Sequence, residues 1–201
     1  IITGTVLIGT ILSNSIVAYS FARLRWPGRD LLFAVLLSTI MLPQQVTMIP
    51  LFILFSKLNW VNTFLPLTVP AFFGSPFFIF LLRQFFMSIP IDLDEAARID
   101  GCNGFMIYWK IILPISKPAL ATVAIFSFMW TWNDFMHPLI YLNKMERYTL
   151  SLGVVLFQTR YQVYWNLLMA ISLLILLPCI LMFFFAQKYF IQGIVATGLK
   201  G

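Results

Sequence analysis

Long apolar stretches separated by short polar segments constrain the fold of this chain more than any other feature. They cover residues 1–22, 31–55, 63–82, 118–132 and 167–185. Apolar runs of this kind are typical of helices that cross a membrane. Hydrophobic residues make up 61% of the chain and charged residues 10%, which excludes an ordinary soluble domain. We therefore expect an all-α membrane protein, a polytopic helical bundle with five spans in this sequence.

Several of these runs contain residues that interrupt a regular helix. The second run contains Pro43 and Pro50, and the third contains three prolines and Gly74. A proline inside a span frees a backbone carbonyl, which is tolerated only where protein or water covers it. We therefore expect the second and third spans to be kinked or locally unwound. In the first run, the polar residues 13–15 predict a face that is turned toward other helices.

Polar side chains at two of the spans are candidates for lining a translocation path. Gln44 and Gln45 lie within the second run, and Asn133 and Asp134 follow the fourth. Each has a structural alternative. Amide side chains often join neighbouring helices by hydrogen bonds, and an acid at the end of a span often pairs or caps locally. A structural role is also expected for His137, the only histidine.

The most highly charged segment lies between the third and fourth runs, at residues 88–117. Its charged side chains include Asp92, Asp94, Glu95, Arg98, Asp100 and Lys110. Such a segment cannot lie in hydrocarbon, because a charge at the bilayer centre costs about 2.5–3.5 kcal/mol. We expect it at a membrane surface, held there by the spans on both sides.

The local pattern of this segment predicts two short helices. Asp92 is placed to cap the first helix, with Glu95 three residues later completing an acidic variant of the capping box. Gly101 is placed to end this helix in a left-handed conformation. Asn103 is placed to cap the second helix, and Pro114 to stop it.

The two predicted helices also carry distinctive surfaces. The small residues Ala96 and Ala97 predict a flat surface that another protein could approach closely. The second helix predicts one apolar stripe, formed by Phe105, Met106, Trp109 and Ile112. From spacing alone, an amphipathic loop packed on its own protein remains an equally good interpretation.

The segment resembles the EAA loop of the membrane subunits of ABC importers. The pattern is E-A-A, three residues, G, nine residues, I, one residue and L-P. Its fixed positions are Glu95, Ala96, Ala97, Gly101, Ile111, Leu113 and Pro114. From about residue 7 to the end, the chain is also similar to the carbohydrate-uptake branch, particularly to the second membrane subunit of the maltose type. That similarity includes the tail at residues 193–201.

The resemblance implies that this segment is a coupling helix, which docks into a cleft of a cytoplasmic ATPase and includes Asp100. It also implies that the cytoplasmic tail, residues 188–201, reaches the ATPase dimer through Gly198, Lys200 and Gly201. The whole sequence, residues 1–201, would form a single transmembrane domain. A sixth span would precede Ile1 in the full chain.

The resemblance also implies partners and a substrate class. The partners are a second membrane subunit, two ATPase subunits that use ATP and Mg, and an extracytoplasmic solute-binding protein. The substrate is a sugar or a related carbohydrate, with a non-sugar solute such as a polyol phosphate as the alternative. No cofactor is expected on this chain itself.

The distribution of lysine and arginine predicts the orientation. The segments around Arg23, the EAA loop and the tail hold nine of these residues, and the opposite segments hold four. The positive-inside rule therefore places the EAA loop and the C-terminus in the cytoplasm of a prokaryotic cell, at its inner membrane.

Motifs for catalysis are absent from the sequence. It contains no G-x-x-x-x-G-K-[ST], H-E-x-x-H or G-x-S-x-G, and its two cysteines and one histidine have no metal-ligand spacing. We therefore expect a transport subunit with no catalytic or metal site, driven by another polypeptide. A membrane enzyme or scaffold whose loop binds some other partner is the alternative from a different class.

Overall fold

The computed structural model describes residues 1–158 and 163–198 of the chain. In these ranges the chain is helical and contains no strand beyond the isolated bridge between Gln158 and Val163. The α-helices are α1 (Ile2–Arg23), α2 (Arg29–Ser38), α3 (Gln44–Lys57), α4 (Leu65–Thr68), α5 (Pro76–Ser88), α6 (Asp92–Ile99), α7 (Gly104–Ile107), α8 (Leu113–Ile115), α9 (Lys117–Trp132), α10 (Met136–Tyr141), α11 (Leu150–Gly153) and α12 (Trp165–Gly198). Short 3-10 turns cover Thr39–Met41, Val69–Phe73, Met145–Arg147 and Val154–Phe157, and a π-helical turn covers Tyr108–Ile112.

Three segments of the described chain are long and apolar enough to cross a membrane. They are Ile2–Arg23, Leu65–Ser88 and Trp165–Phe184. Two further pairs of helices qualify only if each bent pair forms one span, namely Arg29–Met41 with Gln44–Lys57 and Gly104–Ile115 with Lys117–Trp132. The structure therefore holds three to five candidate spans, where the sequence predicted five.

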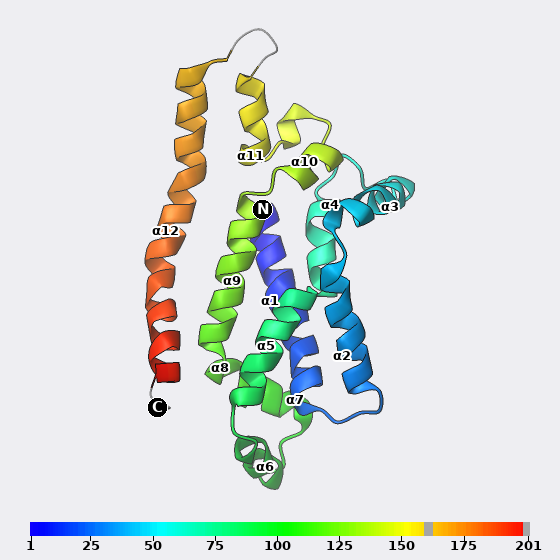
Figure 1. Cartoon of the computed structure of the whole chain (residues 1–201), viewed down its shortest axis with the longest axis vertical. Coiled ribbons are helices and arrows are strands. Elements are labelled where there is room, and N and C mark those ends of the chain that lie inside the picture. The colour runs from blue at the N-terminus through cyan, green and yellow to red at the C-terminus, as the bar shows by residue number, and fades with distance from the viewer. Residues whose placement is uncertain (159–162, 199–201) are drawn as a thin grey trace.

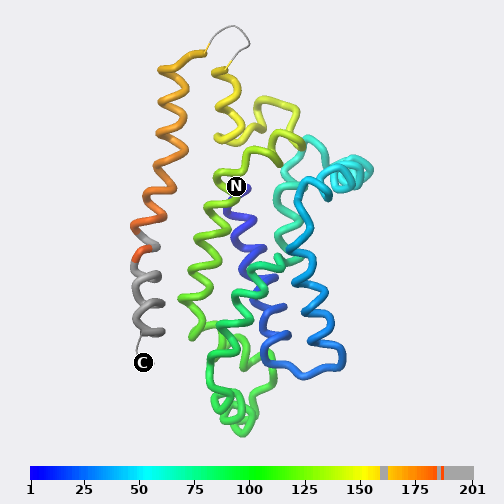
Figure 2. The backbone as a smooth tube through the Cα atoms, viewed as in Figure 1, coloured from blue at the N-terminus to red at the C-terminus, as the bar shows by residue number. Residues whose placement is uncertain are grey.

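Helix α1 lies at the centre of the bundle (Figures 1 and 2). It packs against α5, α9 and the turn Val69–Phe73. Leu82, Phe86 and Val123 in these neighbours are fully buried. Truncation of a buried leucine or phenylalanine to alanine typically costs about 2–5 kcal/mol. Burial against α1 therefore holds the centre of the fold together.

The second apolar run is broken more sharply than a kink. Helix α2 and helix α3 meet at an angle of 98° (Figure 1), with Pro43 in extended backbone between them. Pro50 lies inside α3, and the helix continues through it. The predicted irregularity of the second span is therefore confirmed at Pro43, whereas α3 continues as one helix through Pro50.

The third run is an irregular span, as its prolines predicted. The short helix α4 passes into the 3-10 turn Val69–Phe73, and Gly74 then takes a positive φ of 85°. Pro76 occupies the first turn of α5, where its missing N–H needs no partner. The chain thus restarts as a regular helix only after this break.

The two ends of the bundle differ. Helix α6 lies at one end, and α10 and α11 lie at the other, as Figure 1 shows. The apolar segment Leu150–Phe157 at the second of these ends consists of α11 and a 3-10 turn, so it is too short to cross a membrane. We call these the α6 end and the α10 end.

The last apolar run forms a longer helix than predicted. The sequence predicted an end near Phe185, followed by a tail, but the backbone of α12 continues to Gly198. No proline or glycine falls at residues 179–192, so nothing in the backbone chemistry stops the helix there. Helix α12 packs against α9, and Trp132 Nε1 donates to the Ile175 carbonyl at 3.0 Å.

Candidate functional site: the loop between α5 and α9

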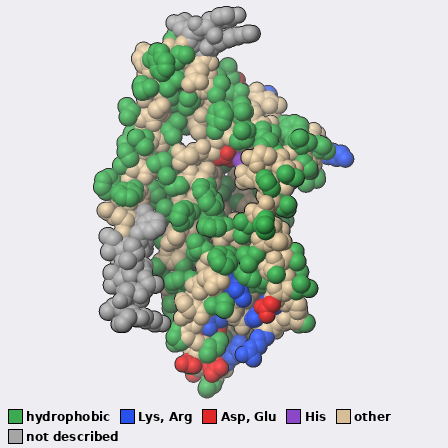
Figure 3. Space-filling model, in the orientation of Figure 1, with side chains coloured by type: hydrophobic (Ala, Val, Ile, Leu, Met, Phe, Trp, Pro, Cys, Tyr) green, Lys and Arg blue, Asp and Glu red, His purple; other side chains and the backbone are tan. Residues whose placement is uncertain are grey.

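The charged loop projects from the bundle between α5 and α9. Helix α6 forms its tip (Figure 1), and acidic and basic side chains gather at this end of the surface (Figure 3). The side chains of Glu95, Arg98 and Asp100 are exposed there. This arrangement leaves α6 open to a partner on its outer side.

The start of α6 differs from the predicted capping box. The N-cap residue is Ile91, with no side-chain hydrogen bond, and Asp92 is already the first residue of the helix. The Ile91 carbonyl accepts hydrogen bonds from the amides of Asp94 and Glu95, at 2.9 and 3.2 Å, so the helix begins one residue earlier than predicted. The acids of the first turn still favour the positive end of the helix dipole.

The turn at Gly101 matches the prediction. Its φ is +82°, and the chain around it forms a Schellman motif that ends α6. The Cys102 amide donates to the Ala97 carbonyl at 2.9 Å, and the Gly101 amide donates to the Arg98 carbonyl at 3.0 Å. The predicted left-handed position of Gly101 is therefore confirmed.

The cap of the next helix is also confirmed. Asn103 Oδ1 accepts a hydrogen bond from the Met106 amide at 2.9 Å, at the start of α7. The Gly101 turn and the Asn103 cap together fix the angle between the two short helices of the loop.

The two alanines of the motif face in different directions. Ala96 is exposed, whereas Ala97 is 5% exposed and packs in the core of the bundle. Successive residues of an α-helix point about 100° apart, so both cannot lie on one flat outer surface. The prediction that both alanines face a partner is therefore wrong for Ala97.

The second half of the loop does not end at Pro114. After the π-helical turn Tyr108–Ile112, the chain continues as α8 through Pro114 to Ile115. Because a π turn bonds residues five apart, it interrupts the α-helical bond pattern in the turn that precedes Pro114. It also changes the predicted stripe: Phe105, Met106 and Trp109 are exposed, but Ile112 is fully buried.

The residues of the motif thus divide into an outer and an inner set. Glu95, Ala96, Asp100, Gly101 and Pro114 are exposed. Ile111 and Leu113 are partly buried and pack against the core that contains Ala97. The inner set attaches the loop to the bundle, and the outer set forms its free surface.

A second polar site lies near the α10 end. A cavity of about 530 Å³ is lined by Gln44, Met129, Trp130, Thr131, Asn133, Asp134 and His137. Figure 3 shows the single histidine beside an acidic side chain at the edge of a hollow. The structure therefore brings together Gln44, Asn133 and Asp134, whereas Gln45 does not line this cavity.

Asp134 pairs with its neighbour His137. Its Oδ2 lies 2.8 Å from His137 Nδ1, and its Oδ1 accepts from the His137 amide at 3.2 Å. The hydrogen bond to Asp134 raises the pKa of His137, although burial opposes this effect. Local pairing of this acid, one of the two interpretations of the sequence, is confirmed.

The amide side chains that are candidates for the translocation path differ in their hydrogen bonds. Asn133 Nδ2 donates to the Met129 carbonyl of its own helix at 2.8 Å. Gln44 and Gln45 have exposed side chains that form no hydrogen bond with the described residues. Within the described part of this chain, neither glutamine joins two helices.

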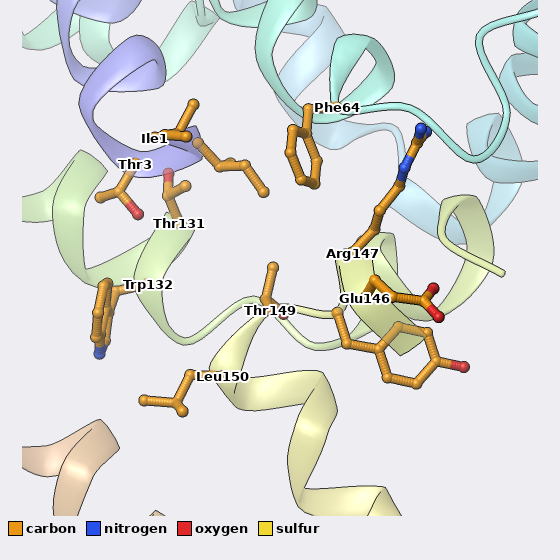
Figure 4. Close-up of a pocket in the computed structure, with 11 residues that line it drawn as sticks. Ile1, Thr3, Phe64, Thr131, Trp132, Glu146, Arg147, Thr149 and Leu150 are labelled. Atoms are coloured by element: carbon orange, nitrogen blue, oxygen red, sulfur yellow. The ribbon is translucent and has the colours of Figure 1, made fainter. Parts of the chain in front are cut away.

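A neighbouring cavity of about 280 Å³ is mostly apolar. It lies between the start of α1, the end of α9 and residues 146–150 (Figure 4). The carboxylate of Glu146 and the guanidinium of Arg147 point away from its centre (Figure 4). Arg147 instead donates to the Asn62 carbonyl. This cavity offers few polar groups to a ligand.

The predicted tail contacts fall at the edge of the described chain. Gly198 is the last residue of α12, and Lys200 and Gly201 lie outside the described residues. Within the described residues, no cluster of three or more acidic, histidine or cysteine side chains is arranged to hold a metal ion.

The polar face of α1 is a feature whose full extent the sequence interpretation missed. Asn14 and Ser15 are each 1% exposed, and both form hydrogen bonds outside α1. Tyr19 and Arg23 lie on the same side of the helix and also contact the loop. The spacing of four residues between Ser15, Tyr19 and Arg23 was the signal that could have revealed this.

The fold and the loop together define a helical membrane protein of the transporter class. The chain matches the family model described as "Binding-protein-dependent transport system inner membrane component" over residues 6–195. It belongs to this family, the permease subunits of ABC transporters.

Individual relatives agree with this assignment. The chain is 36% identical, over 98% of its length and 70% of the relative's, to the "Arabinooligosaccharides transport system permease protein AraQ" of Halalkalibacterium halodurans. It is 35% identical, over 93% of its length and 68% of the relative's, to the "Probable starch degradation products transport system permease protein AmyC" of Thermoanaerobacterium thermosulfurigenes. A crystal structure of a bacterial ABC transporter involved in the import of the acidic polysaccharide alginate matches with a TM-score of 0.79 and 26% identity, over 94% of this chain and 71% of that one.

Proposed function

We propose that this chain is the permease subunit of an ABC importer that moves a sugar or related carbohydrate by alternating access, coupled to ATP hydrolysis in partner subunits. The names of the relatives support the substrate class, since they describe permeases for arabinooligosaccharides and for starch degradation products. The partners would be a second membrane subunit, two ATPases that use ATP and Mg, and an extracytoplasmic binding protein.

One observation carries the coupling role: α6 projects beyond the bundle, and two of its motif residues, Glu95 and Ala96, are exposed. Glu95 and Ala96 lie on its free side, and the Schellman turn at Gly101 holds the helix at a defined angle. A carboxylate on such a surface suits a basic partner surface. Closure of the ATPases would push or pull α6, and the broken spans would respond.

The distribution of basic residues supports an orientation of the bundle in the membrane. Arg23, Arg25 and Arg29 lie where α1 passes into α2, at the same end of the bundle as α6 (Figure 1). The positive-inside rule favours the cytoplasm for this end. The C-terminal end of α12 lies at this end as well (Figure 1), so the C-terminus would also be cytoplasmic.

The polar cavity at the α10 end is the proposed part of the translocation path in this chain. Gln44, Asn133 and Asp134 provide hydrogen-bonding groups, and Trp130 provides an aromatic wall. A cavity with an apolar wall and a few convergent polar groups is typical of small-molecule sites. The hydroxyl groups of a sugar can both donate to and accept from such groups.

Co-purification tests the coupling role. The full-length chain is co-expressed with its partner subunits, purified in mild detergent and scored for bound ATPase. We expect Glu95→Lys to lose the ATPase, because the exposed charge is reversed on the free side of α6. The matched control is Glu146→Lys, since Glu146 is the only other glutamate, is also exposed and lies at the α10 end. Equal retention by both variants would contradict the proposal.

A further inference from the structure

One face of α1 carries a row of buried polar side chains that point at the loop between α5 and α9. Ser15, Tyr19 and Arg23 are four residues apart, so they lie on one face of the helix. They are 1%, 6% and 8% exposed. Polar groups this deeply buried are expected to have partners. Ser15 Oγ donates to the Ile11 carbonyl of α1 at 2.6 Å, and each of the three residues also has a partner in the loop.

Each residue of this row contacts a different part of the chain between α5 and α8. The Ser15 and Tyr108 hydroxyl oxygens lie 2.8 Å apart. The Tyr19 hydroxyl donates to the Gly104 carbonyl at 2.9 Å, and the rings of Tyr19 and Tyr108 are 5.2 Å apart. Arg23 Nη2 donates to the Ile89 carbonyl at 2.6 Å. The loop is thus bound to α1 near its start, middle and end.

Arg23 also neutralises a buried acid in α6. Asp94 is 1% exposed, and its Oδ2 lies 3.9 Å from Arg23 Nε. Neither of its carboxylate oxygens has a hydrogen-bond partner among the described residues. A buried carboxylate needs a compensating charge, so the position of α6 depends on this contact with α1.

A second set of α1 side chains contacts the break in the third span. Ser13 Oγ donates to the Ala71 carbonyl at 3.0 Å, and Asn14 Oδ1 accepts from the Ser75 amide at 2.6 Å. These contacts lie beside those of Ser15 on the same helix. Helix α1 therefore contacts both elements. Its residues 15–23 bind the loop, and its residues 13 and 14 bind the irregular segment of the third span.

We propose that Ser15, Tyr19 and Arg23 are positioning residues, which join the loop to α1 so that the two move as one body and transmit displacements of α6 to the break at residues 69–75. This proposal rests on the proposed function, because it assumes that an ATPase displaces α6. It assigns the transmission to α1 and not to the direct chain connections through α5 and α9.

The first test removes one contact of the row. Tyr19→Phe removes the hydroxyl that donates to Gly104 but keeps the ring beside Tyr108. The complete transporter is reconstituted in vesicles, and labelled arabinotriose and maltotriose are offered as substrates. We expect the ratio of sugar transported to ATP hydrolysed to fall about fivefold, the effect of one lost hydrogen bond. The amount of assembled complex should stay unchanged.

The matched control is Ser20→Ala. Ser20 is the neighbour of Tyr19 on α1, and its hydroxyl forms no hydrogen bond with the described residues. The variant should keep the wild-type ratio. An unchanged ratio in Tyr19→Phe, or a fall matched by an equal loss of assembled complex, would overturn the positioning role.

The second test asks whether the loop and α1 move as one body. A Cβ atom at Gly104 would lie 3.9 Å from Leu24 Cδ2, so cysteines at these two positions suit a short, reducible cross-linker. The double variant Leu24→Cys/Gly104→Cys is made with Cys102 and Cys179 replaced by serine. We expect cross-linked transporter to retain transport within about twofold, because a bond inside one rigid body blocks no required motion.

The outcomes separate the two levels of inference. If cross-linking stops transport and reduction restores it, the loop moves relative to α1 and the positioning role is wrong. If the wild-type transporter takes up neither sugar and shows no binding-protein-stimulated ATP hydrolysis, the proposed function fails, and the inference fails with it. Retained transport after cross-linking, together with the lower ratio in Tyr19→Phe, supports the inference.

Discussion

Asn14 Oδ1 accepts a hydrogen bond from the backbone amide of Ser75, 2.6 Å away and 61 residues along the chain. Asn14 is 1% exposed and lies in the middle of α1, and Ser75 is the residue that precedes α5. The same side chain donates through Nδ2 to the Thr10 carbonyl of its own helix at 2.6 Å. One amide side chain thus satisfies a free backbone group at the break of the third span.

We predict that Asn14→Leu destabilises the protein by about 1–3 kcal/mol, because it leaves the partly buried Ser75 amide without an acceptor. Leucine is close to asparagine in size, so the effect would come from the missing hydrogen bond. Thermal unfolding of the full-length chain in detergent would measure it.

The control for this change is Asn166→Leu at the start of α12. Asn166 is exposed, and a surface substitution of this kind typically changes stability by about 0.5 kcal/mol or less. If both variants unfolded at the wild-type temperature, the Asn14–Ser75 contact would not be a stabilising one.

We predict that Gly101→Val abolishes binding-protein-stimulated ATP hydrolysis, whereas Gly101→Asn largely keeps it. The φ of Gly101 is +82°, and a Cβ added there would meet nothing within 4 Å. A substitution at this position therefore acts through the backbone conformation and not through a steric clash. An L-residue in the left-handed region costs about 1–2 kcal/mol, more when it is β-branched and less for asparagine.

Insertion into the membrane should be unaffected in both variants, since Gly101 lies outside the candidate spans. Steady-state ATP hydrolysis by the assembled transporter is the measurement. Wild-type activity in the valine variant would show that the turn between α6 and α7 does not depend on a left-handed residue.

Local signals predicted the irregular parts of this fold well. The prolines and Gly74 of the third run, Pro43 in the second run and Gly101 in the loop all mark real breaks. Each acts through its own backbone, by a missing N–H or a preferred φ, so the sequence within a few residues suffices.

The wrong predictions concern features of the loop that tertiary packing determines. Ala97 faces the core, and Pro114 is carried inside a helical segment that follows a π-helical turn. Which face of a short helix is buried, and where a helix bends, depends on neighbours that are distant in sequence, such as Tyr19 for Gly104. The spacing of residues within the loop cannot predict these neighbours.

We predict that stability falls as the pH rises through the range above 6.5, because of His137. The hydrogen bond to Asp134 raises its pKa in the folded protein above the unfolded value near 6.5. A group with a raised folded pKa stabilises the protein fully below its unfolded pKa and loses this contribution as the pH passes the folded pKa. The unfolding temperature should therefore be higher at about pH 6 than at about pH 8.

The substitution His137→Gln should remove this difference, because His137 is the only histidine in the chain. Asp134→Asn should remove most of it as well, since the carboxylate is the main cause of the shift. The measurement is the unfolding temperature of the three proteins at the two pH values. An equal pH dependence in all three would assign the effect to other groups.

We predict that Gln44→Leu weakens transport, whereas Gln45→Leu does not. The two glutamines are adjacent and both exposed, but only Gln44 lines the polar cavity with Asn133 and Asp134. Loss of one hydrogen bond to a sugar hydroxyl should raise the KM of uptake by about fivefold in the Gln44 variant, with the Gln45 variant within about twofold of wild type. Uptake of labelled arabinotriose or maltotriose by vesicles that contain the complete transporter is the measurement. Because both substitutions add the same apolar side chain at the start of α3, an equal effect would reflect a disturbed helix, and only a difference between them supports a path through this cavity.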